Sequence, residues 1–136
     1  MKKLGFMQGR LVDSEKKNSI QYFPAKKWQQ ELILAKKLNF KIMEWTINIE
    51  NMEMNPIFNG DIDRVKFLKK KNKIDIPSLT CDYFMQAPFF KKKNQKKKKT
   101  ILDNLKKMIE NGQKIGIKYF IFPLVDNSSI KLKSEE

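Results

Sequence analysis

The chain has 136 residues, 40% of them hydrophobic, which is enough for one domain with its own core. No apolar run approaches the ~18 residues of a membrane span, and a single cysteine, Cys81, excludes an intrachain disulfide. The net charge of +14 favours anionic partners, but only two of the 29 basic residues are arginines, so specific nucleic-acid binding is not expected. We therefore expect a soluble cytoplasmic protein without membrane contact, in which Cys81 is a buried thiol.

Four apolar segments are strand candidates, and helical patterns lie between them. In chain order we expect a strand at 4–11, a helix near 26–38, a strand at 41–47, a helix at 61–71, a strand at 75–80, a helix from Thr100 and a strand at 119–125. The strand starts are spaced by roughly 35 to 45 residues, which is typical of βα units. The expected fold is α/β, with about four parallel strands and three helices, an incomplete (β/α)₈ barrel that needs about twice this length to close.

A repeated unit supports this topology. Residues 35–45 align without a gap on residues 112–122, and each copy has the pattern of a helix end followed by a buried strand. Asn39 and Gly116 occupy the same position in the two copies, and both residue types tolerate the positive φ that ends a helix. The unit therefore predicts two matching helix-to-strand junctions.

Polar residues follow or end each strand candidate, where parallel α/β sheets bind ligands. The candidate substrate-binding residues are Gln8, Arg10, Glu44, Trp45, Asp82, Gln86, Asp126 and Asn127. Their amides and carboxylates suit sugar hydroxyls, the indole suits an apolar sugar face, and the guanidinium suits a phosphate. The alternatives are a core position for Trp45, a turn or cap for the acids, and a surface position for Arg10.

Residues 91–99 contain seven lysines, and we expect them in a loop of roughly 18 residues that precedes the third helix. The first interpretation is a solvated, mobile run. The second is electrostatic attraction of a phosphorylated substrate.

Five stretches resemble the sugar phosphate isomerase/epimerase family with a xylose isomerase-like TIM barrel. They are residues 7–11, 20–24, 40–46, 77–89 and 121–127. The resemblance implies that residues 1–136 form the amino-terminal half of such a barrel and bind a small sugar or sugar phosphate. It also implies a divalent metal in full-length relatives, held mainly by second-half strands. We expect no metal or cofactor in this chain, which has no histidine, and no catalysis by it alone.

Three functions stay open at this point. The first is an isomerase-type half barrel that works with a complementing carboxyl-terminal half. The second is a non-catalytic half barrel that self-associates as a homodimer. The third is a basic polyanion-binding module, whose affinity would depend strongly on salt.

Overall fold

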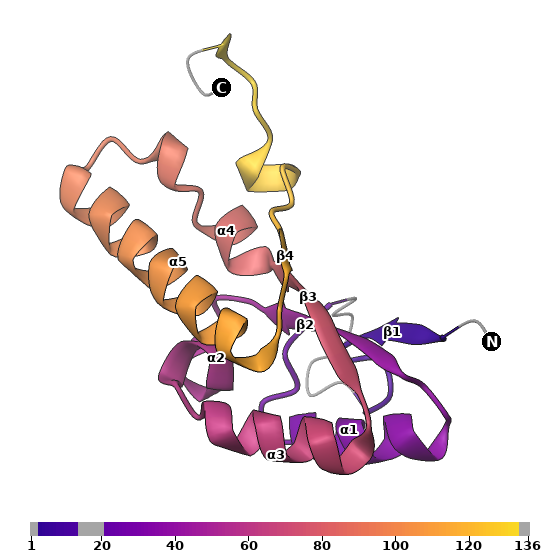
Figure 1. Cartoon of the computed structure of the whole chain (residues 1–136). Coiled ribbons are helices and arrows are strands. Elements are labelled where there is room, and N and C mark those ends of the chain that lie inside the picture. The colour runs from indigo at the N-terminus through magenta and orange to yellow at the C-terminus, as the bar shows by residue number, and fades with distance from the viewer. Residues whose placement is uncertain (1–2, 14–20, 134–136) are drawn as a thin grey trace.

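The sheet of this protein contains four parallel strands in the order β1-β2-β3-β4 (Figure 1). The computed structural model describes residues 3–13 and 21–133. The strands are β1 (Gly5–Met7), β2 (Ile42–Ile47), β3 (Asp75–Cys81) and β4 (Tyr119–Ile121). The expected parallel α/β architecture is confirmed, although β1 and β4 are shorter than the apolar runs that predicted them.

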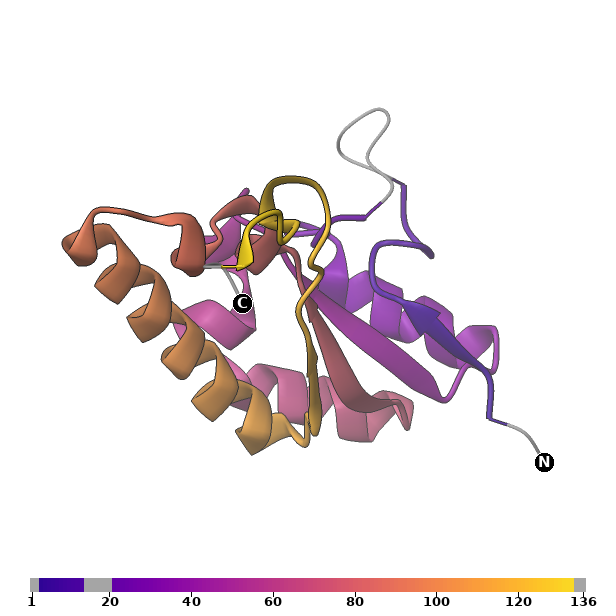
Figure 2. The same cartoon turned by 90° about the horizontal axis from the view of Figure 1, so that it is seen from above.

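Three longer helices connect consecutive strands, namely α1 (Trp28–Lys37), α3 (Ile62–Asn72) and α5 (Gln95–Ile115). Shorter elements follow the carboxyl ends of the strands: η1 (Met52–Met54), α2 (Pro56–Asn59), α4 (Asp82–Gln86), η2 (Phe89–Lys91) and η3 (Asp126–Ser128). These were not expected, because elements of three to five residues are too short to show helical periodicity. Helix α3 contacts both α1 and α5. In Figures 1 and 2 the three longer helices lie on one side of the sheet, and no helix of the described residues covers the other side, which we call the bare face of the sheet.

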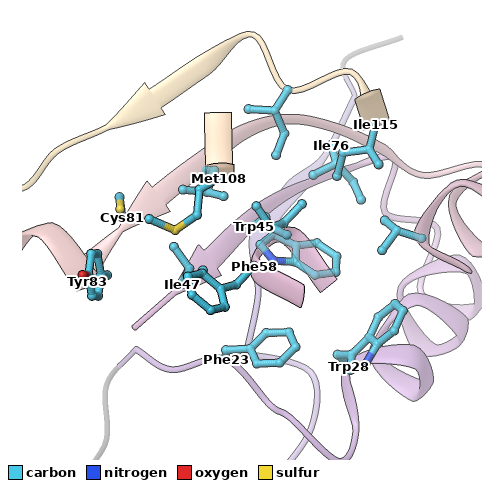
Figure 3. Close-up of a cluster of buried hydrophobic side chains, with 14 of the residues drawn as sticks. Phe23, Trp28, Trp45, Ile47, Phe58, Ile76, Cys81, Tyr83, Met108 and Ile115 are labelled. Carbon is cyan, nitrogen blue, oxygen red and sulfur yellow. The ribbon is translucent and has the colours of Figure 1, made fainter. Parts of the chain in front are cut away.

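The core lies between the sheet and the helices. Met43, Trp45 and Ile47 alternate along β2 and are fully buried. The Trp45 ring centroid lies 5.7 Å from that of Trp28 and 5.9 Å from that of Phe23 (Figure 3). Trp45, predicted as a substrate-binding residue, lies in the core, because the period of two along a strand turns it toward the helices and Glu44 away from them.

A β-bulge sets which residues of β3 face the core. Between Ile42 and Glu44 of β2, the paired stretch of β3 contains one extra residue. As a result Ile76 and Leu79 are both buried in the core, although they are three positions apart. Pro77 lies in this irregular stretch, where the missing N–H of a proline interrupts the pairing of the strands least.

The three helix-to-strand junctions share one geometry. A residue with left-handed φ ends each helix: Asn39 (61°), Lys73 (57°) and Gly116 (95°). The N–H of the residue after it donates to the carbonyl five positions back. The N–H of the residue after that donates to a carbonyl of the preceding strand, or of the residue just before that strand. These bonds are Phe40 to Ala35 (2.9 Å), Ile74 to Lys69 (3.1 Å) and Ile117 to Gly112 (3.1 Å), then Lys41 to Leu4 (2.9 Å), Asp75 to Lys41 (2.8 Å) and Lys118 to Pro77 (2.8 Å). The predicted unit therefore occurs three times.

The lysine-rich segment is only in part a loop. Helix α5 begins at Gln95, and the Asn94 side chain caps it by accepting the N–H of Lys97 at 3.1 Å. The expectation that residues 95–99 belong to a loop and that the helix starts at Thr100 is wrong. Thr100 lies inside the helix, where its hydroxyl donates to the Lys96 carbonyl at 3.0 Å. Asparagine is as good an amino-terminal cap as threonine, and the later apolar stripe packs the helix.

Candidate functional site

The bare face of the sheet carries a hydrogen-bonded carboxylate. The hydroxyl of Ser78 donates to Oε2 of Glu44 at 2.8 Å, and the hydroxyl of Thr80 donates to Oε1 at 2.6 Å. Glu44 lies within β2, paired with Ser78, and not at the end of the strand as the sequence suggested. Both hydroxyls come from alternate positions of the neighbouring strand, so the backbone register itself aims them at the carboxylate.

A second carboxyl group lies close enough to Glu44 to be affected by its charge. Asp82 is the first residue of α4, directly after β3, and its side chain is largely buried. Burial first and the negative charge of Glu44 second together raise the pKa of Asp82 from 3.8 to about 6. The pair therefore combines one carboxylate fixed by two hydroxyls with one carboxyl that exchanges its proton near neutral pH.

Gln8 follows β1 directly and continues its hydrogen bonds with β2 beyond the last residue of the strand. Its N–H donates to the Glu44 carbonyl at 2.9 Å, and its side-chain Oε1 accepts the N–H of Thr46 at 3.0 Å. Gln8 is fully buried, and its Nε2 has no hydrogen-bond partner among the described residues. The Oε1 atom thus stabilises the sheet, and the buried amide nitrogen is the one polar atom of this side chain without a partner in the described residues.

The loop after β1 is held by a residue that the sequence did not indicate. Glu31 of α1 is fully buried, and its Oε1 accepts the N–H groups of Gly9 at 2.8 Å and Leu11 at 3.0 Å. Burial raises the pKa of Glu31, and the backbone donors oppose that rise. Arg10 lies in this loop with an exposed side chain.

The remaining candidates border the carboxyl pair. Gln86 at the end of α4 accepts the N–H of Ile49 through Oε1 at 2.7 Å, which joins the segments that follow β2 and β3. Helix α4 also contacts η3, which begins with the exposed residues Asp126 and Asn127. Helix α4, with Asp82 and Gln86, thus meets η3 beyond the carboxyl end of β3, whereas Glu44 lies further back within β2.

The sequence missed Ser78, Thr80 and Glu31. The alternation of Ser78 and Thr80 on a strand next to Glu44 is a signal that could have found the first two. No pattern marked Glu31, because an acidic residue in the first turn of a helix is common for reasons of the helix dipole alone.

A cavity of about 340 Å³ opens at the opposite end of the sheet. Its lining is mostly lysine, with Lys66, Lys69, Lys70, Lys73, Ile74, Asp75, Lys114 and Ile115. Lys69 Nζ donates to the carbonyl of Ile115 at 2.7 Å. The lysines surround the carboxyl-terminal turns of α3 and α5, where cations offset the negative end of the helix dipole, so their role is stabilisation of the fold.

No protein-family model matches this chain, and no curated protein matches it. Within residues 3–13 and 21–133, no helix is long and apolar enough to cross a membrane. The same residues contain no group of three or more Cys, Asp or Glu side chains that could hold a metal ion. The site must therefore be interpreted from its geometry.

Proposed function

We propose that the sheet is half of an eight-stranded (β/α)₈ barrel. The strand order follows the chain order, whereas a doubly wound sheet reverses its order at a switch point. The helices pack on one face, and three equivalent junctions add each strand to the same edge. A sheet built in this way curves around its bare face, which is the lumen side of a barrel.

We further propose that this half barrel binds the substrate of a sugar or sugar-phosphate isomerase or epimerase. The observation that carries the proposal is the Glu44 carboxylate on the bare face of the sheet, which accepts the hydroxyls of Ser78 and Thr80, with the Asp82 carboxyl directly after the end of β3. Polyols are recognised by carboxylates and hydroxyls held in fixed directions. The resemblance of residues 40–46 and 77–89 to sugar phosphate isomerases/epimerases supports the same class of ligand.

In this proposal the two carboxyl groups have different tasks. Glu44 accepts a hydrogen bond from a hydroxyl of the sugar, because each of its oxygens has a second lone pair beside the one that accepts from Ser78 or Thr80. Asp82 holds or takes a proton, because its pKa near 6 lets both forms exist around neutral pH. The described residues contain no group of three or more Cys, Asp or Glu side chains that could hold a metal ion, so this proposal assigns no metal to Glu44 and Asp82. The proposal assigns substrate binding to Glu44 and Asp82, and catalysis of the isomerisation would require further residues from the other half of the barrel.

The test is direct binding to a panel of pentoses, hexoses and their phosphates, followed by chemical shifts of backbone amides. We expect weak binding with shifts at β2, β3 and α4, and at least a tenfold loss of affinity in Glu44→Gln and Asp82→Asn. Asp63→Asn is the matched control, because Asp63 is an exposed acid on α3. Inorganic phosphate is included to separate sugar recognition from attraction of anions. No shift at these elements with any sugar would refute the proposal.

A further inference from the structure

The outer edge of β4 is exposed and has no charge. Residues 119–125 form a continuous uncharged run in a chain in which 32% of residues are charged. Tyr119 is 66% exposed and Ile121 is 41% exposed. Native proteins protect edge strands with lysine, proline or a covering segment. The three residues of β4 include neither a lysine nor a proline, although Lys118 precedes the strand and Pro123 lies two residues after it, so the strand itself offers an uncharged edge for pairing.

The outer edge of β1 has the same character. Leu4 is 63% exposed, and residues 4–8 carry no charge. Half of the large hydrophobic side chains that are exposed in the described residues belong to these two edges and the segment after β4. They are Leu4, Tyr119, Ile121, Leu124, Val125, Ile130 and Leu132. Such a concentration of apolar surface marks an interface.

We propose that two copies of the chain associate head to tail, with β4 of each copy pairing with β1 of the other. The inference rests on the half-barrel topology of the proposed function and not on sugar binding. Because β1 and β4 run in the same direction, this arrangement continues the parallel sheet at both edges and closes a ring of eight strands. Pairing of β4 with β4 around a twofold axis would be antiparallel and would leave both β1 edges open.

The second copy is the occupant that the edges favour. It offers two uncharged parallel edges at the required spacing of four strands, and it leaves no edge unpaired. Closure also covers the bare face, because Tyr119 and Ile121 pair with Ser78 and Thr80 and therefore lie on the face of Glu44. Each copy carries a net charge of +14, so repulsion opposes the dimer and added salt should tighten it.

The first test is the mass in solution by sedimentation equilibrium and light scattering. We expect twice the chain mass of 16.2 kDa, with a dissociation constant that falls as salt is added. Ile121→Lys should give the monomer mass with an unchanged circular dichroism spectrum. Phe67→Lys is the matched control, since Phe67 is a 62% exposed aromatic on α3, and it should stay dimeric. A monomer at every concentration and salt overturns the proposal, whether or not sugars bind.

The second test identifies the edges that meet and does not depend on the lysine variant. Cys81 is fully buried, so the cross-linker should react only with the cysteine introduced by Leu4→Cys or by Tyr119→Cys. A short bis-maleimide should join the two variants when they are mixed, and neither variant by itself. Cross-linking between two molecules of the Tyr119→Cys variant would show that β4 pairs with β4, and it would overturn the head-to-tail arrangement.

Discussion

Replacing Asp82 with asparagine should change how the stability of the fold depends on pH. Asp82 is largely buried and lies beside Glu44, and both facts disfavour its charged form. Asparagine has nearly the same size and cannot ionise. The variant therefore removes the cost of burying a charge and keeps the packing.

The pKa of Asp82 rises from the ordinary 3.8 to about 6 on folding. Between these values the folded protein binds more protons than the unfolded chain, so the free energy of unfolding falls as pH rises. The stabilisation is fully present below the unfolded pKa and is lost as pH passes the folded pKa. This pKa difference corresponds to roughly 3 kcal/mol. Asp82→Asn should thus match the parent in acid and exceed it by up to that amount at neutral pH.

The assay is urea unfolding of both proteins at intervals from about pH 4 to pH 7, with the difference in free energy plotted against pH. The raised pKa of Glu31 is common to both proteins and cancels in this difference. Asp63→Asn, at an exposed position, should give a nearly flat line. A parent-minus-variant difference that does not change with pH, or that grows in favour of the parent as pH rises, would refute the reasoning.

Three further outcomes are expected. Lys73→Gly should stabilise the fold by about 1 kcal/mol, because a left-handed φ is strained for lysine and not for glycine. Gly116→Ala should destabilise the fold by about 1 to 2 kcal/mol at the equivalent junction, and urea unfolding measures both effects. Cys81 should resist aromatic disulfide reagents in the native state and react on unfolding, because it is buried and its pKa is raised to about 12. Lys97→Glu should raise the melting temperature by placing an acid in the first turn of α5, whereas Lys114→Glu in the last turn should lower it.

The order and direction of the strands could be predicted from the sequence because the signals are local. Apolar runs at the spacing of βα units indicated a parallel sheet, and Asn39 with Gly116 marked two junctions. The third junction at Lys73 was invisible, since lysine has no preference for positive φ and is held there by the same backbone bonds. The start of α5 was missed because four lysines oppose the helix dipole, a cost of tenths of a kcal/mol that packing overrides.

The candidate site was predicted only in part, because the sequence does not show which face of the sheet each residue of a strand points to. Glu44 and Trp45 are neighbours in sequence, yet the pleat of β2 sends them to opposite faces. The sequence indicated that both lie near the end of a strand and could not decide which one faces the ligand. The β-bulge in β3 adds a shift of one residue that no local pattern announces, so the meeting of Ser78 and Thr80 with Glu44 depends on pairing between strands.

Each strand after the first enters the sheet through a connection made of its own turn and three consecutive backbone amides. A connection of this kind does not depend on what lies further along the chain. The same backbone connection therefore serves three different helix-to-strand sequences, and the side-chain bonds between units, such as Lys69 to the Ile115 carbonyl and Asn111 to the Ile57 carbonyl, are what a transplanted βα unit would have to preserve.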